Sequence, residues 1–470
     1  MISISALRHT PLLSLRRLGD FYMPLCMTGT LLHLALDLSM AVWLARATLV
    51  LFLVLQFPRL KTTPKTLLML CLGGGALALL VGGDVSPTLD ALDRFCYFAT
   101  FISSLGLLRV AALRSPLIRA AGLTLIRQRP AWRYPGLALG TAAFGVIINI
   151  GALNLFGSMI RKGNSAGSTD LRAAREKRMM LALLRGFALT PIVSPLSIAT
   201  VVVLSKMPSL AWSDLAPLAF VAGAVMFLLG WLLDAWQSPP VAPNNQPTPP
   251  LQPLWRFCAL MLGITALVFL VSALCRVSLP IAVLIACPLA AFVWLSLQLR
   301  RLNGGSGAGR ALALLNRRAE PIFAGQRGEI VMLGGSACLG TLLAAHIDIQ
   351  ALEQLLSVSG LHGILLVVLA MVTVLVFSQL GLNPVVSVTV LLSLVPDPMA
   401  LDMDPRVLAV AMMCAWGLAM MSSPFTTVLL IVAGFARRSP YYLAWRWNGA
   451  LFALAAMTCA LLLWLAQTLV

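Results

Sequence analysis

The chain has 470 residues, of which 60% are hydrophobic and only 11% carry a formal charge. Soluble proteins are nearer to half apolar and a quarter charged, so this composition excludes a water-soluble fold. The 34 Lys and Arg against 16 Asp and Glu give a net charge of +18. Cytoplasmic loops of membrane proteins retain Lys and Arg, so we interpret the excess as a topology signal rather than as nucleic-acid binding.

The apolar residues gather in windows of about twenty, which is the length a helix needs to cross the ~30 Å hydrocarbon core. We therefore predict an all-α polytopic membrane protein with about eleven transmembrane helices in the inner membrane of a bacterium. The predicted apolar segments lie at 21–37, 39–57, 66–83, 94–110, 135–160, 179–205, 216–236, 255–274, 279–299, 329–345, 364–389, 408–435 and 445–468.

The chain divides into two halves around a proline-rich stretch. Residues 1–38 are predicted to be a cytoplasmic tail and an extra first helix, and residues 39–236 the first repeat. Residues 237–254, which contain SPPVAPNNQPTPPLQP, form a stiff cytoplasmic linker because proline favours extended geometry. Residues 255–470 are the second repeat.

A shift of 229 residues aligns the two repeats, since 383 − 154 = 229 places Asn154 on Asn383, and Ser194 falls on Ser423. Charge supports the alignment. The loops at 109–134 and 161–185 are basic, whereas the shifted windows are acidic. Equivalent loops therefore prefer opposite sides of the membrane, which indicates an inverted-topology repeat.

Two segments have like-charged flanks at both ends and should return to the side they enter from. Residues 135–160 are predicted to be a re-entrant hairpin from the cytoplasm, and residues 364–389 one from the periplasm. Asn154 and Asn383 would lie toward their tips. With two hairpins and eleven spans, the N-terminus is cytoplasmic and the C-terminus periplasmic.

Prolines interrupt the apolar helices 179–205 and 408–435. Pro191 and Pro195 interrupt the first and Pro424 the second, while Pro384 follows the second hairpin tip. Each proline removes a backbone donor, so carbonyls are freed for a solute or a coupling ion. The predicted site consists of amides, hydroxyls and helix ends near these breaks, from Asn154, Thr190, Ser194, Ser197, Asn383, Ser387, Ser422, Ser423 and Thr426.

The pattern of a basic loop, an apolar helix and TPI-x-[ST]-P resembles the ion transporter superfamily, including divalent anion:sodium symporters and arsenite-type carriers. The matching run is TPIVSP, residues 190–195, where the family reads much like TPIGTPPN. The resemblance implies eleven spans, two hairpins, a homodimer and possible Na⁺ coupling. Leu153, Leu155, Leu382 and Pro384 replace the Ser and Thr that flank the family's tip Asn residues, which argues against a dicarboxylate substrate.

No cofactor, metal site or catalytic residue is predicted, since the nine cysteines stand singly and no metal-binding motif occurs. We expect a secondary active transporter for a small anionic or polar solute, whose partners are the lipid bilayer and that solute. A non-transporting membrane scaffold is the alternative. A membrane enzyme would need paired carboxylates, and Asp402 and Asp404 are interpreted as an outer loop.

Overall fold

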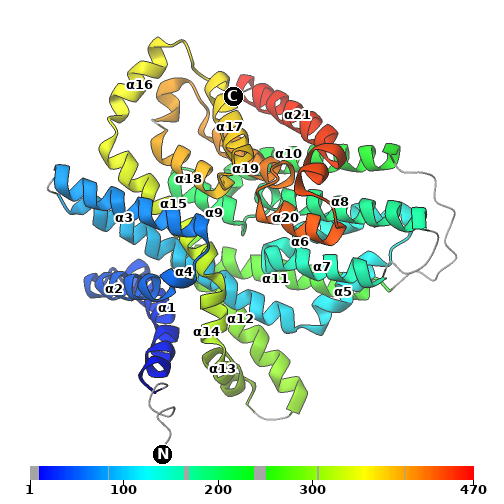
Figure 1. The fold of residues 1–470 in the computed structure, drawn as a ribbon, viewed down its shortest axis with the longest axis horizontal. Coiled ribbons are helices and arrows are strands. Elements are labelled where there is room, and N and C mark those ends of the chain that lie inside the picture. Colours follow the sequence, from blue (N-terminus) through cyan, green and yellow to red (C-terminus); the bar gives the residue numbers. More distant parts are fainter. Residues whose placement is uncertain are drawn as a thin grey trace, which may run out of the picture. The chain divides into compact units, whose positions relative to one another are not determined.

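A computed structural model describes residues 10–82, 84–163, 169–237, 250–303, 306–395 and 397–469. The regular elements within these ranges are all helices (Figure 1). The chain forms two compact units. The first comprises Met1–Ala111, Val271–Val277 and Ile281–Ile347, and the second comprises Ala112–Leu270, Ser278–Pro280 and Asp348–Val470. Each unit therefore combines segments of both predicted repeats. Most of the predicted linker, 237–254, lies outside the described residues.

The first unit is held together by close contacts between its helices. In it, a Cβ added to Gly334 would lie 2.3 Å from the ring of Phe95, so only glycine permits this approach. Arg46 donates two hydrogen bonds of 2.7 Å to the carboxylate of Asp93. Its elements are α1 (Thr10–Leu36), α2 (Ser39–Gln56), η2 (Phe57–Arg59), α3 (Thr62–Gly82), most of α4 (Ser86–Arg114) and of α12 (Leu279–Asn303), α13 (Gly307–Arg317), α14 (Ala319–Phe323), η3 (Ala324–Gln326) and α15 (Arg327–His346).

The second unit is built around a helix that is buried on all sides, α19 (Pro405–Ser422). A helix that is apolar all round must be enclosed by others. The remaining elements are α5 (Pro116–Ile126), α6 (Pro130–Ile148), α7 (Ile150–Gly163), α8 (Thr169–Val193), α9 (Ile198–Lys206), α10 (Trp212–Gln237), most of α11 (Gln252–Cys275), α16 (Ile349–Val358), α17 (Ile364–Gln379), α18 (Pro384–Leu394), η4 (Pro398–Leu401), α20 (Thr427–Ala436), the π-helix η5 (Tyr442–Trp447) and α21 (Gly449–Thr468).

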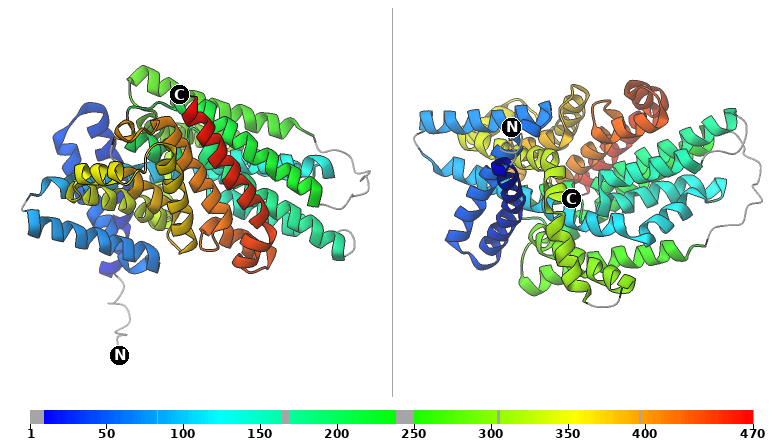
Figure 2. Two further views of the ribbon diagram at one scale, coloured as in Figure 1. Left: turned by 90° about the horizontal axis from the view of Figure 1, so that it is seen from above. Right: turned by 60° about the horizontal axis from the view of Figure 1, so that its bottom comes forward.

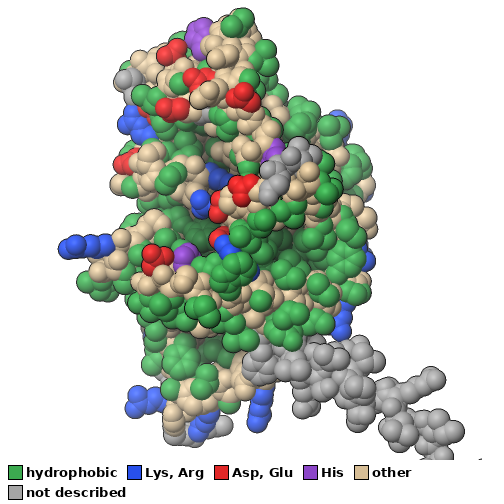
Figure 3. Space-filling model, turned by 90° about the vertical axis from the view of Figure 1, so that its left-hand side faces the viewer, with side chains coloured by type: hydrophobic (Ala, Val, Ile, Leu, Met, Phe, Trp, Pro, Cys, Tyr) green, Lys and Arg blue, Asp and Glu red, His purple; other side chains and the backbone are tan. Residues whose placement is uncertain are grey.

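Ten helical stretches of the described residues are long and apolar enough to cross a membrane. The described part of α1 adds a shorter apolar stretch, Tyr22–Leu36. Large apolar side chains lie fully exposed on many helices, among them Leu80 and Trp236, each 84% exposed. Hydrophobic side chains cover much of the face in Figure 3. Such surfaces suit lipid rather than water. The chain is an all-helical polytopic membrane protein, as the sequence predicts.

The two halves repeat the same order of elements, and the register is preserved at the helix breaks. Helix α8 ends at Val193 and α19 at Ser422, and 193 + 229 = 422. Helix α9 begins at Ile198 and α20 at Thr427, and 198 + 229 = 427. The shift of 229 residues inferred from the sequence therefore superimposes both interruptions.

Within the second unit the two copies meet around an approximate twofold axis. Ala188 of α8 contacts its own equivalent, Gly417 of α19 (188 + 229 = 417), because a Cβ at Gly417 would lie 2.4 Å from the Ala188 carbonyl oxygen. Arg185 lines a cavity together with Met421, so α8 and α19 cross in antiparallel directions. Figures 1 and 2 show α8 in green and α19 in orange. An antiparallel crossing at equivalent residues is the arrangement that a twofold relation between the copies would produce.

The contacts away from the axis are reciprocal, as a twofold relation requires. Helix α9 packs against α18, and its equivalent α20 packs against α7. Gly157 of α7 leaves room for the ring of Phe435, to which an added Cβ would lie 2.3 Å away. The second helix of each hairpin segment therefore lies against the resumed half-helix of the other copy.

Both predicted hairpin segments are pairs of short helices joined by a turn. Helix α6 ends at Ile148 and α7 begins at Ile150, with Asn149 between them at φ +52°. The rings of Phe144 and Phe156 lie 4.9 Å apart, so α7 folds back on α6. Helices α17 and α18 are joined through Gly381 at φ +99°. Entry of each pair into the membrane from one side remains a prediction.

The close approach at the axis leads to a test of stability. Replacing Gly417 by Ala places a methyl group against the Ala188 backbone, and we expect a loss of about 1–3 kcal/mol from overpacking. Gly434 of α20 is the matched control, because an added Cβ there meets nothing within 4 Å. Gly434→Ala should be neutral or stabilising by about 0.5–1 kcal/mol. Thermal unfolding in detergent measures both, and equal melting temperatures would contradict the axis contact.

Candidate functional site

The first break lies between α8 and α9 and is closed by local hydrogen bonds. The Ser197 hydroxyl donates to the Pro191 carbonyl at 3.3 Å and accepts from the Thr200 amide at 3.1 Å. The Thr200 hydroxyl donates to the Ser194 carbonyl at 2.7 Å. These side chains satisfy backbone groups that the interrupted helix leaves without partners.

The second break, between α19 and α20, repeats one of these hydrogen bonds at the equivalent positions. The Thr426 hydroxyl donates to the Met420 carbonyl at 3.1 Å. This bond is the counterpart of that between Ser197 and Pro191, since 197 + 229 = 426 and 191 + 229 = 420. The Ser423 hydroxyl accepts from the Phe425 amide at 3.3 Å.

A further pair of bonds repeats as well. In the first break the Ser194 hydroxyl accepts from the Leu196 amide at 3.2 Å, as Ser423 accepts from Phe425 in the second. The copies differ in most side chains, yet they share these two hydrogen bonds at their breaks. The site is therefore a duplicated structural device rather than a chance kink.

The second hairpin is bonded directly to the second break. The Ser423 hydroxyl donates to the Ser378 carbonyl at 2.6 Å, and the Gln379 amide donates to the Ser422 hydroxyl at 3.2 Å. The hydroxyls of Ser378 and Ser387 are buried and have no hydrogen-bond partner among the described residues. These two hydroxyls are available to a polar ligand, since an unpaired buried hydroxyl is costly.

The two predicted tip asparagines have different positions. Asn383 lies at the turn and caps α18, because its side-chain oxygen accepts from the Val385 amide at 3.0 Å. Asn154 does not lie at a tip. The turn is at Asn149, and Asn154 is exposed on α7, where its amide donates to the Ile150 carbonyl at 3.4 Å. The predicted tip position of Asn154 is wrong, because the turn lies near the centre of the segment, at Asn149, and Asn154 follows it by five residues on α7.

Contacts also join the first hairpin to α8. The Thr190 hydroxyl donates to the Ala142 carbonyl of α6 at 3.1 Å. Gly145 faces the same hydroxyl, and an added Cβ would lie 2.7 Å from it. The structure thus brings Thr190, Ser194 and Ser197 together along one break, and Ser422, Ser423 and Thr426 along the other.

Sequence reasoning missed the most unusual residue of the second unit, Arg185. We counted it with the basic loop, but it lies within α8 and is only 4% exposed. Its Nε donates to the Asn448 side-chain oxygen at 2.8 Å, and its Nη1 donates to the Gly230 carbonyl at 3.2 Å. The run MMLALLRGFAL around it was the available signal, because a single charge inside an apolar helix is costly and usually functional.

Arg185 lines a small cavity inside the second unit. The cavity has room for roughly one water molecule. Its walls are otherwise apolar or aromatic: Tyr134, Ala138, Leu189, Met226, Phe227, Met421 and Leu451. The guanidinium carbon lies 5.9 Å from the centre of the Tyr134 ring, which is within range of a cation–π contact.

The carboxylates outside the site have structural partners or exposed positions. Asp37 follows the end of α1, is exposed and lies 3.8 Å from His33. Glu329, in the first turn of α15, lies 3.9 Å from Arg109. No group of three His, Cys, Asp or Glu side chains suited to a metal ion occurs in the described part of the chain.

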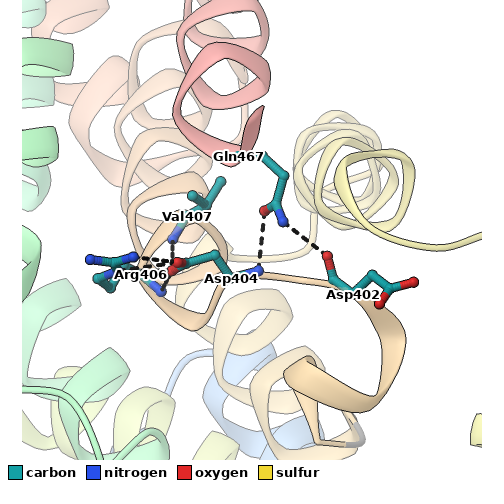
Figure 4. A network of polar contacts seen from close by, with 5 residues as sticks. All are labelled: Asp402, Asp404, Arg406, Val407 and Gln467. Atoms are coloured by element: carbon teal, nitrogen blue, oxygen red, sulfur yellow. Dashed lines mark hydrogen bonds and ion pairs between the residues drawn. The ribbon is translucent and has the colours of Figure 1, made fainter. Parts of the chain in front are cut away.

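Asp402 and Asp404 lie in the connection before α19 (Figure 4). Asp404 caps the helix, accepting from the amides of Arg406 at 2.6 Å and Val407 at 3.3 Å. The Arg406 guanidinium also binds this carboxylate, at 2.6 Å. Gln467 bridges the backbones of Asp402 and Asp404. These contacts give Asp404 a capping role at the helix end and leave it unsuited to acid–base chemistry.

Comparison with known proteins identifies the fold. Neither a protein-family model nor a curated protein matches the chain in sequence. Among solved structures it is similar to the YdaH transporter of Alcanivorax borkumensis, with TM-score 0.52 and 17% identity, covering 85% of this chain and 98% of that one. MtrF of Neisseria gonorrhoeae, described with a class of antimetabolite efflux pumps, gives TM-score 0.41 and 13% identity over 82% and 85%. The chain therefore shares the fold of the YdaH structure. Membership of the ion transporter superfamily remains a prediction.

The contacts of Asp404 predict a pH dependence of stability. Burial raises the pKa of Asp404, but the Arg406 guanidinium and the two amides outweigh this effect and hold the pKa below the ordinary value of a carboxyl. The stabilisation is therefore complete above the unfolded pKa of about 4 and is lost as the pH falls through the folded value. Asn also caps helices, so Asp404→Asn removes the charge alone. The variant should melt below the wild type at pH 7, and the difference should shrink at pH 3. A difference independent of pH would contradict this account.

Proposed function

We propose that the protein is a secondary active transporter that moves a small anionic or polar solute by alternating access. The observation that carries the proposal is the duplicated break, closed by the same hydrogen bonds in two copies related by a twofold axis. Two equivalent copies can exchange conformations at little cost in energy, which is how inverted repeats open a site to either side. The fold shared with the YdaH transporter supports the proposal.

The solute would meet the breaks beside the second hairpin. The unpartnered hydroxyls of Ser378 and Ser387 would hydrogen-bond it, and Ser194, Ser423 and Thr426 would line the path. Ser423 bonds the break to the hairpin, so the two move as one body when the site opens. Asn154 is not part of this arrangement, because it lies on the exposed surface of α7.

Cation coupling rests on the family resemblance. The carbonyls of Pro191 and Met420 accept hydrogen bonds from Ser197 and Thr426, and the Met421 carbonyl accepts from Asn448. A sodium ion at these oxygens would have to displace those donors. Sodium dependence of solute flux in vesicles would support coupling, and equal flux in sodium and choline buffers would exclude it.

The orientation of the repeats can be tested by cysteine labelling. In a background without native cysteines, Lys162→Cys and Met399→Cys place thiols at two exposed positions, one in the last turn of α7 and one in η4. Because α8 and α19 cross in antiparallel directions, we expect an impermeant maleimide to label Lys162→Cys from the cytoplasm and Met399→Cys from the periplasm. Labelling of both from one side would contradict the inverted repeat.

Transport itself is tested with the second break. Ser423→Ala removes the bond to the Ser378 carbonyl, so we expect at least a tenfold loss of flux for small organic acids in proteoliposomes, with unchanged protein amount. Ser158→Ala is the matched control, because this serine bonds only the nearby Leu155 carbonyl on α7. Full activity in Ser423→Ala would mean that the break is only structural.

A non-transporting membrane scaffold is the second candidate. The observation that favours it is the satisfaction of the freed carbonyls by Ser197, Thr426 and Asn448, which leaves both breaks closed. Absence of flux for every solute in a broad panel, with the folded protein in vesicles, would select the scaffold.

A further inference from the structure

We propose that Arg185 forms a binding site for the carboxylate of a small monocarboxylic acid with an apolar body. The inference rests on the proposed transport function and deepens it by naming the substrate class. Its basis is a buried guanidinium that retains an unused hydrogen-bond donor. This group lies on the wall of an otherwise apolar cavity. It belongs to α8, one of the two broken helices on which the proposed function rests.

The charge of Arg185 is not neutralised by the described residues. Its Nε and Nη1 bind the neutral oxygens of Asn448 and Gly230, and the neutral phenol of Tyr134 also lies beside the guanidinium. The buried Nη2 forms no well-aligned hydrogen bond. No ion pair of the described chain includes Arg185, and the nearby Asp234 is bound to Arg178 at 2.7 Å. A buried cation without a counter-charge is strongly disfavoured, so an external anion would relieve a cost that the folded protein carries.

The fold itself does not require this arginine. The position equivalent to Arg185 in the second copy is Cys414, since 185 + 229 = 414. The partners Asn448, Gly230 and Tyr134 correspond to Ala219, Cys459 and Gly363, so the whole polar group is absent from the other copy. A group needed only for packing the duplicated helices would be expected in both copies.

The cavity wall specifies the rest of the ligand. Seven of its side chains are apolar or aromatic and only Arg185 is charged, so the site suits one negative group joined to an apolar body. The space in this state holds roughly one water molecule. Met226 and Met421 line it, and methionine side chains adapt readily to irregular volumes, so a small ligand can enlarge the space by displacing them.

Arg185 also connects the ligand to the second break. Asn448 accepts from Arg185 and donates to the Met421 carbonyl at 2.9 Å, one residue before the end of α19. A carboxylate bound to Nη2 would therefore be linked through three hydrogen bonds in series to a backbone oxygen freed by the break. Occupation of the site is coupled in this way to the segment that the proposed function expects to move.

The test is thermal unfolding of the purified full chain in detergent, with butyrate as the probe and butyramide as its neutral isostere. We expect butyrate, and not butyramide, to raise the melting temperature of the wild type. Arg185→Gln should raise the Kd for butyrate at least tenfold, while Arg185→Lys, which keeps the charge, should retain part of the shift. Arg119→Gln, at an exposed arginine of α5, is the matched control and should behave as the wild type.

One further variant keeps the proposal falsifiable if Arg185→Gln does not fold. Met226→Phe fills the cavity without changing the charge, and it should abolish the butyrate shift. An equal response to butyrate and butyramide, or a full butyrate shift in Arg185→Gln or Met226→Phe, would overturn the site. A normal wild-type shift without any flux in vesicles would overturn the transport proposal alone.

Discussion

The structure depends on a backbone constraint. A helix interrupted inside a protein core leaves amides and carbonyls without partners, and no bulk water is present to satisfy them. Both interruptions of the second unit solve this problem with hydroxyls placed at the same positions, Ser194 and Ser197 in one copy and Ser423 and Thr426 in the other. The positions of these side chains follow from the geometry of the gap, which explains why they repeat although the surrounding sequence has diverged.

Much of the architecture could be predicted from the sequence because it rests on composition and on prolines. The apolar windows give the helices, and the alignment of Ser194 with Ser423 locates both breaks to the residue. The hairpin turns were harder. Asn383 precedes a proline and lies at its turn, whereas the first turn is formed by Asn149 at positive φ, which no glycine or proline marks. Asn154 was predicted to lie at a tip only because the shift of 229 residues aligns it with Asn383.

Arg185 illustrates a different limit of sequence reasoning. Basic residues near the ends of apolar segments usually belong to cytoplasmic loops, so counting charges assigns them to the membrane boundary. Helix α8 begins at Thr169 and continues through the basic stretch into the core. Arg185 therefore lies about four helical turns after the start of α8. Its neighbours Asn448 and Gly230 come from segments more than forty residues away, and their convergence could not be read from local patterns.

The crossed packing of the copies has a mechanical consequence. Helix α9 lies against α18, and α20 lies against α7, so each half-helix is seated on the hairpin of the opposite copy. Neither half-helix can shift unless the opposite hairpin yields. The small residues Ala188 and Gly417 bring the two backbones together at the axis and provide a pivot. The movements of the two halves are consequently coupled, and a displacement of one half requires a displacement of the other.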